Sequence, residues 1–164
     1  MMNSKQIIKL LPYKEPFLFV DELTEISEEG ITGNYTFKET AFFYKGHFKD
    51  NPVTPGVILT ETMAQIGVVC LGIYSCLGRN PNLTNLNQEI DLGEDSRVDG
   101  NPQIALTSSQ VDFFLPVFPR EKVTVVSKKV FFRFNKLKCK VELFNEKEEL
   151  VCRGEISGMI SIPA

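Results

Sequence analysis

The sequence predicts an α+β fold in which a curled antiparallel sheet wraps around one long buried helix. Residues 57–73 are apolar on almost every face, which is typical of a helix buried on all sides. Segments on both sides of this stretch read as strands, and the later ones alternate apolar and polar residues as half-buried antiparallel strands do. Because a curled sheet can bury such an apolar cylinder, we predict a single domain over residues 1–164.

Composition excludes several classes of protein. The chain has 164 residues, of which 43% are hydrophobic, and a net charge of −3 at pH 7. We expect no nucleic-acid partner, because duplex binding depends on a clustered excess of Lys and Arg. The apolar run after Gln65 spans about a dozen residues, fewer than the roughly 18 that a bilayer span needs, and the N-terminal apolar run is too short for a secretory signal. We therefore expect a cytoplasmic protein without a membrane span.

The cysteines show no metal-binding pattern. None of the four has a C-x-x-C spacing, and the single histidine cannot complete a typical zinc set, so we expect no metal. Two lie in the apolar helix and two in strand-like segments, where cysteine behaves as a small hydrophobe. We interpret them as reduced core residues; a cysteine nucleophile is the less favoured alternative. The four are Cys70, Cys76, Cys139 and Cys152.

The remaining elements follow from local patterns. Residues 5–10 predict a short helical turn that ends before Pro12, and strands are expected over residues 17–26 and 31–37. The aromatic residues of 41–44 are interpreted as core or subunit interface in preference to substrate contact. Residues 79–101 are rich in Asn, Gly, Pro and acidic residues, which predicts a long loop that is either a lid or poorly ordered. Further strands are expected over residues 123–134, 137–143 and 150–160, with a turn at 145–148.

The candidate site lies around the start of the long helix. His47 precedes the helix, Pro55 and Gly56 mark its first turn, and Glu61 and Gln65 share one face at a spacing of i, i+4. A carboxyl group in apolar surroundings is paired, hydrated or kept protonated, and a protonated one can act as a general acid. The free N–H groups at a helix start can polarise a carbonyl oxygen.

Less specific interpretations of the same residues stay open. His47 can be an ordinary surface or core histidine, and Glu61 can be a structural carboxylate that pairs with a Lys or Arg from another strand. Gln65 can orient Glu61 or a departing water molecule, or it can make a hydrogen bond at a helix interface.

Three sequence blocks resemble one enzyme family. The pattern H-F-x-x-x-P-x-x-P-G, with an acid five residues after the glycine, begins at His47 and ends at Glu61, within E-x-M-A-Q. Together with LPYKEPFLFVDEL at 11–23 and FFLPVFPREK at 113–122, it resembles the 3-hydroxyacyl-acyl carrier protein dehydratases of the FabZ/FabA type, which have the hot-dog fold. The chain departs from the family in its long 79–101 segment, which leaves chain-length preference open.

The resemblance implies dehydration of a 3-hydroxyacyl thioester to a trans-2-enoyl thioester, in fatty acid synthesis or a related lipid or polyene pathway. His47 would take the α-proton, Glu61 would protonate the leaving hydroxyl and Gly56 N–H would hold the thioester oxygen. Gln65, Pro55 and Phe48 would contact substrate. No cofactor is implied beyond the phosphopantetheine of acyl carrier protein that carries the substrate. The resemblance also implies a homodimer with shared active sites, with a trimer of dimers as a higher assembly.

A basic run of strand residues is the candidate docking surface for the acidic carrier protein. Between Glu121 and Glu142 every charge is positive, which is also the pattern of a solvated strand face that guards a sheet edge. Family members usually carry basic residues before the proline of the third block, where this chain has Asp112, Phe114 and Leu115. The docking candidates are Lys128, Lys129, Arg133 and Lys136.

Two other functions remain open. A hot-dog acyl thioesterase would use Glu61 as general base or nucleophile. A non-catalytic acyl-carrier-binding module or assembly subunit is the second, suggested by the altered residues near Asp112 and by the long 79–101 segment.

Overall fold

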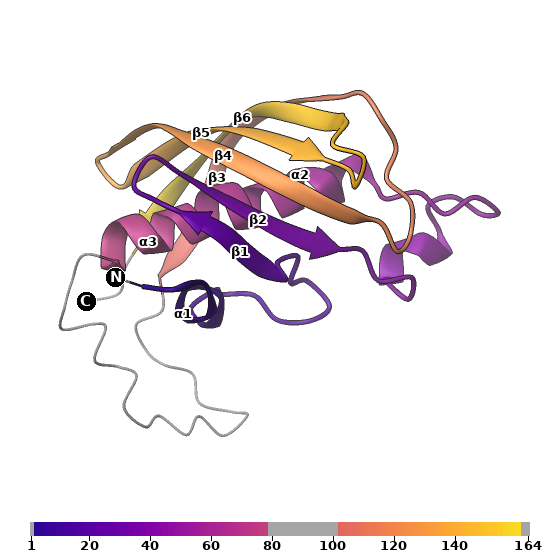
Figure 1. The fold of residues 1–164 in the computed structure, drawn as a ribbon, viewed down its shortest axis with the longest axis horizontal. Helices are drawn as coiled ribbons and strands as arrows, with labels where there is room; N and C mark the ends of the chain where they lie inside the picture. Colours follow the sequence, from indigo (N-terminus) through magenta and orange to yellow (C-terminus); the bar gives the residue numbers. More distant parts are fainter. Residues whose placement is uncertain (1, 79–101, 162–164) are drawn as a thin grey trace, which may run out of the picture.

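The structure is a computed structural model that describes residues 2–78 and 102–161. It contains a six-stranded antiparallel sheet with strand order β1-β2-β4-β5-β6-β3, curled around one long helix (Figure 1). This confirms the predicted α+β architecture. The predicted 79–101 loop lies outside the described residues.

The helical and strand segments alternate along the chain in an order that places the long helix between two groups of strands. Their bounds are α1 (Ser4–Lys9), β1 (Glu22–Ile26), β2 (Gly30–Thr36), the 3-10 helix η1 (Phe42–Lys45), α2 (Gly56–Ala64), the π-helical η2 (Gln65–Cys70), α3 (Leu71–Leu77), β3 (Gln103–Phe113), β4 (Lys122–Arg133), β5 (Lys136–Phe144) and β6 (Leu150–Ser161).

The first strand is shorter than predicted. We expected a strand from residue 17, but β1 begins at Glu22, and residues 17–21 form an irregular segment. The reason is a long-range contact: Phe19 N–H donates to Oε1 of Gln65 at 2.8 Å, so its backbone pairs with the helix and with no strand. The predicted N-terminal helical turn is confirmed as α1, which begins with a capping box between Asn3 and Gln6.

The long helix forms the core. Segments α2, η2 and α3 run continuously from Gly56 to Leu77, and the inner face of the sheet covers them with fully buried side chains such as Val125, Val141 and Ile156. This helix is the one in the described residues that is long and apolar enough to cross a bilayer, and 78% of its most apolar window is buried inside the protein. Such burial is also found in the core helices of proteins that have no membrane span.

A π-helical turn interrupts the helix, and the sequence pattern did not predict it. The hydroxyl of Ser127 on β4 donates to the carbonyl oxygen of Gly67 at 2.8 Å, which ties this turn to the sheet. A side chain at Gly67 would meet Ser127 Cβ and Val141 Cγ1 at 3.0 Å each. Gly67 therefore lets the helix approach the sheet closely at this point.

Strand β3 was not predicted. It pairs with β6 and forms one edge of the sheet, and most of its 11 residues are exposed. Because both faces meet solvent in the single chain, its residues show little alternation between apolar and polar types. The free edge of a long strand offers unpaired N–H and C=O groups to another chain.

The β4–β5 hairpin closes with the two residues Phe134 and Asn135, both in the left-handed region at φ 52° and 59°. The turn joins Arg133 to Lys136, which face each other across the hairpin. The strands predicted over residues 123–134, 137–143 and 150–160 are confirmed as β4, β5 and β6.

Candidate active site

His47 is held by its own loop. Its Nδ1 lies 2.8 Å from the carbonyl oxygen of Val53, and the ring stacks on Phe48 with 4.0 Å between centroids. Because a carbonyl can only accept a hydrogen bond, Nδ1 carries the proton in the neutral ring and Nε2 keeps its lone pair. The ring is half-buried, so Nε2 can accept a proton from a bound molecule.

The start of α2 is fixed by the third sequence block. Thr54 N–H donates to the carbonyl oxygen of Val117 at 2.8 Å, and the buried Thr54 hydroxyl lies 2.6 Å from the hydroxyl of Tyr44. The helix then begins at Gly56, whose N–H makes no hydrogen bond with the described residues. A Cβ on Gly56 would lie 3.3 Å from the Phe113 ring, so this ring borders the free amide.

Glu61 is held by Gln65, one turn further along the helix. Gln65 Nε2 donates to Glu61 Oε1 at 2.9 Å and to the carbonyl oxygen of Phe17 at 3.1 Å, while Gln65 Oε1 accepts from Phe19 N–H. Gln65 therefore both orients Glu61 and tethers residues 17–19, so two of the interpretations left open by the sequence hold together. No lysine or arginine of the described residues pairs with the half-buried Glu61.

The site unites the three sequence blocks. The first block contacts Gln65 through Phe17 and Phe19, and the third contacts Thr54 and Gly56 through Val117 and Phe113. Blocks far apart in sequence thus converge on the first turns of the long helix.

Tyr13 is a residue that the sequence reasoning missed. Burial, and after it the nearby carboxyl group of Glu61, raise the pKa of Tyr13 to about 12. The phenol therefore stays neutral and can donate a hydrogen bond at physiological pH. Tyr13 lies within the first sequence block, LPYKEPFLFVDEL at 11–23.

The four cysteines are free thiols, three of them buried, as the sequence predicted. Burial raises the pKa of Cys139 to about 11 and that of Cys152 to about 12, which disfavours the thiolate. The described residues contain no cluster of His, Cys, Asp or Glu that could hold a metal ion.

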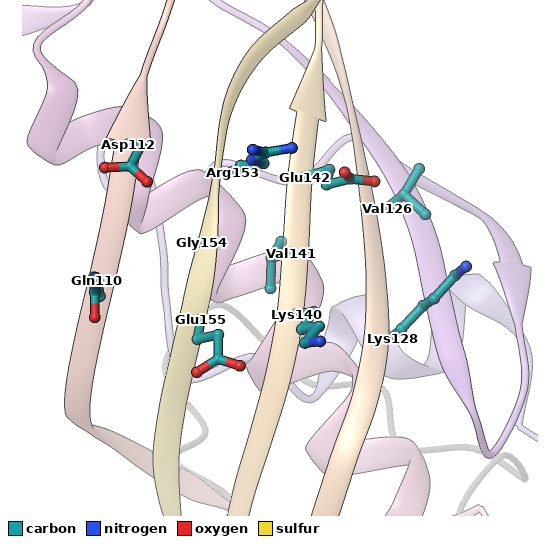
Figure 2. A pocket seen from close by; sticks show the side chains of 10 residues that line it. All are labelled: Gln110, Asp112, Val126, Lys128, Lys140, Val141, Glu142, Arg153, Gly154 and Glu155. Carbon is teal, nitrogen blue, oxygen red and sulfur yellow. The ribbon is translucent and has the colours of Figure 1, made fainter.

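A hollow of about 510 Å³ lies elsewhere, on the outer face of the sheet (Figure 2). Its floor includes Val141 and Gly154, and charged residues of both signs surround it, among them Arg153 and Glu155. His47, Gly56 and Glu61 do not line it. A hollow lined by so many charged side chains does not suit an acyl chain.

The four predicted docking residues do not form one cluster. Lys128 lines the outer-face hollow, and Lys129 Nζ bonds to the carbonyl oxygen of Glu28 and to the carboxylate of Glu29. Arg133 and Lys136 flank the β4–β5 turn, where the Arg133 guanidinium lies 5.0 Å from the Phe131 ring centroid.

A sequence profile of the FabA-like domain matches residues 11–149. The chain belongs to this family. The 3-hydroxyacyl-[acyl-carrier-protein] dehydratase FabZ of Clostridium perfringens (strain SM101) is 44% identical over 73 residues, which cover 43% of this chain and 51% of that protein. FabZ of Anaplasma marginale (strain Florida) is 45% identical over 73 residues, covering 43% and 48%. The matched region thus spans about half the length of these curated relatives.

Solved structures of other proteins with a similar fold superpose on this one. The dehydratase heterocomplex ApeI:P from Xenorhabdus doucetiae has a TM-score of 0.69 at 12% identity and covers 98% of this chain and 93% of that one. A thioesterase from Haemophilus influenzae has a TM-score of 0.64 at 12% identity, covering 99% and 92%. The fold is therefore the predicted hot-dog fold; at these identities the neighbours show the fold alone.

Proposed function

We propose that the protein removes water from a 3-hydroxyacyl thioester on acyl carrier protein to give the trans-2-enoyl thioester. The observation that carries this proposal is the 2.8 Å contact between His47 Nδ1 and the carbonyl oxygen of Val53. Because a carbonyl oxygen only accepts hydrogen bonds, Nδ1 donates and Nε2 is available as a base. The family membership and the FabZ relatives support the same chemistry.

In the proposed elimination, His47, Glu61 and Gly56 each act on a different atom of the substrate. His47 Nε2 takes the α-proton, the released electron pair forms the C=C bond, and the C–O bond to the 3-hydroxyl breaks. Glu61 gives its proton to the leaving hydroxyl, which departs as water, and Gly56 N–H donates a hydrogen bond to the thioester oxygen. The proton on His47 then returns to Glu61 for the next cycle. This chemistry requires no metal or redox cofactor.

The hydrogen bond from Gln65 supports Oε2 of Glu61 as the acidic oxygen of the proposed mechanism. Because Glu61 Oε1 accepts from Gln65, a protonated Glu61 would carry its proton on Oε2 and present that oxygen to the leaving group. Phe48, stacked on His47, and Pro55, which caps α2, are the proposed substrate contacts beside Gln65.

The proposal includes a homodimer in which the two subunits share the active sites. It is supported by the free edge of β3 and by exposed apolar side chains on and after that strand, Leu106, Phe113 and Phe114. Phe113 borders Gly56, so a chain paired along β3 would reach the start of α2. A trimer of dimers remains a prediction.

The partner in this proposal is acyl carrier protein, and its docking at Lys128, Lys129, Arg133 and Lys136 remains a prediction, as does a cytoplasmic location. The excess of positive charge on β4 and β5 supports attraction to an acidic carrier. The pathway is fatty acid synthesis or a related lipid or polyene synthesis.

The decisive assay uses carrier-bound 3-hydroxyacyl substrates of graded chain length. We expect enoyl product, detected by mass spectrometry as loss of water, with no free carrier thiol. Release of thiol from acyl thioesters that lack the 3-hydroxyl would establish a thioesterase instead. Carrier binding without turnover at any chain length would establish a binding module.

A further inference from the structure

The tip of the β4–β5 hairpin carries exposed apolar side chains next to basic ones. This end of the hairpin lies near α3, away from the start of α2 (Figure 1). Phe134 at the apex is 93% exposed, Val130 46% and Met159, which faces Lys136 across β5 and β6, 42%. The tip patch comprises Val130, Phe131, Arg133, Phe134, Lys136 and Met159.

Neither the turn conformation nor packing within the fold explains why residue 134 is a phenylalanine. Its φ of 52° lies in the left-handed region, which suits Asn135 beside it but is unfavourable for a bulky side chain. Its ring contacts no other ring among the described residues, and the guanidinium of Arg133 covers Phe131 instead. Turn geometry favours Asn or Gly at this position, and packing gains nothing from the ring. Packing within the single chain therefore does not account for a phenylalanine at this position.

The charged side chains in the sequence around the apex are all basic. Residues 128–140 carry six basic side chains and no acidic one, in a chain whose net charge is −3. Lys129 pairs with Glu29, and Lys138 pairs with Glu155 at 2.6 Å. Arg133 and Lys136 make no ion pair with the described residues, so the apolar apex is flanked by uncompensated positive charge.

We propose that the tip patch binds the surface of an anionic phospholipid bilayer. Phe134 enters the headgroup region, and Arg133 and Lys136 face the lipid phosphates. A second copy of the patch would bring like charges together, which opposes self-association through this surface. To bind a protein partner, a single ring on a narrow turn would need a pocket of matching shape. Insertion into a bilayer requires no such pocket. The inference goes beyond the proposed catalytic function and does not depend on it. It assigns Arg133 and Lys136 to the bilayer in place of the carrier docking predicted for these two residues.

The absence of tryptophan from the sequence allows a direct test. Phe134→Trp makes residue 134 the sole tryptophan of the full chain. With vesicles of phosphatidylcholine containing about 30% phosphatidylglycerol, we expect a blue-shifted emission and quenching by brominated lipid chains. Salt at about 0.5 M should reverse both changes, because it screens the attraction between exposed charges. Unchanged emission with these vesicles, or equal binding to pure phosphatidylcholine, would overturn the proposal.

Co-sedimentation of the unlabelled protein with the same vesicles gives the second measurement. Phe134→Asn suits the left-handed backbone, so the variant keeps its fold, and we expect its vesicle partition to fall at least about tenfold. The double variant Arg133→Gln/Lys136→Gln should lower it by roughly ten- to thirtyfold. Lys5→Gln/Lys9→Gln removes the same charge from exposed α1 positions and should leave binding nearly unchanged.

Two results would reject a membrane partner. The first is equal loss of binding in the α1 control, which would mean that only overall charge matters. The second is a change of oligomeric state in Phe134→Asn, seen by light scattering, without vesicle binding by the parent protein. That result would assign the tip patch to contact between copies of the chain.

Discussion

Gln65 donates a 2.9 Å hydrogen bond to the carboxyl group of Glu61 from one helical turn away. Its second amide hydrogen goes to the carbonyl oxygen of Phe17, and its oxygen accepts from Phe19 N–H. Every polar atom of this fully buried side chain is therefore occupied. Orientation of Glu61 and attachment of the N-terminal segment depend on the same amide.

Gln65→Leu should lower the free energy of unfolding by about 2 to 4 kcal/mol, because it leaves Phe19 N–H and the Phe17 carbonyl without their partner. Urea denaturation measures the change. Thr60→Val is the control on the same helix, since the Thr60 hydroxyl makes a single bond, to Gly56, and its loss should cost under about 1 kcal/mol. Equal losses in the two variants would contradict the tethering role.

His47→Ala should lower the turnover of a carrier-bound 3-hydroxyacyl substrate by about a hundredfold to ten-thousandfold, because it removes the base. Circular dichroism should show an unchanged fold. Lys49→Ala, two residues further along and exposed, should keep the parental rate. An unchanged rate in His47→Ala would remove this residue from the mechanism.

Gly67→Ala should destabilise the protein by about 1 to 3 kcal/mol, because the new methyl group would meet Ser127 and Val141 at 3.0 Å. Thermal and urea unfolding both report the change. Gly46→Ala is the matched control: its φ is −121°, and no atom lies within 4 Å of the added Cβ. If the two alanine variants have the same stability, the close approach of helix and sheet is not a constraint.

The stability of the protein should fall as the pH rises from about 9 to about 11. Burial raises the pKa of Cys139 from 9.0 to about 11, so in this window the unfolded chain loses a proton that the folded chain keeps. This stabilisation is fully present below pH 9 and amounts to about 2 to 3 kcal/mol when lost. Urea midpoints against pH should decline less steeply in Cys139→Ala than in the parent.

Cys76 provides a control, within the same chain, for the prediction about Cys139. Cys76 is only half-buried, and burial raises its pKa as well. Cys76→Ala should leave the alkaline slope closer to that of the parent than Cys139→Ala does. A slope in Cys139→Ala identical to the parental one would assign the alkaline loss to other groups.

Leu106→Lys should shift the proposed homodimer toward monomer, because it places a charge on a side chain of β3 that is 43% exposed in the single chain. Size-exclusion chromatography with light scattering gives the mass. Val130→Lys changes a side chain of similar exposure on β4, away from the β3 edge, and should keep the parental mass. A dimer that withstands Leu106→Lys would argue against assembly along β3.

The long helix and strands β4 to β6 could be predicted because their apolar residues repeat with a clear period. Strand β3 could not, since both of its faces are exposed in the single chain and its pattern is weak. The start of β1 was misplaced because the apolar residues Phe17 and Phe19 belong to a segment that bonds to Gln65, 48 and 46 residues away. Local patterns do not show bonds over such separations.

The candidate site was predictable to the extent that it is local in sequence. His47, Gly56 and Glu61 lie in one short segment, so their spacing could be read directly. The tautomer of His47 depends on the fold of its loop around Val53, and the place of Tyr13 beside Glu61 depends on the path of the N-terminal segment. Neither follows from periodicity.

The π-helical turn over Gln65–Cys70 has a consequence for comparing relatives. Such a turn holds one more residue than an α-helical turn, so everything from Leu71 onward is rotated about the helix axis relative to an unbroken α-helix. A relative with one residue fewer here would align with a gap in the middle of its helix. The hydroxyl of Ser127 would then face a different carbonyl, and the distal half of the helix would present other side chains to the sheet.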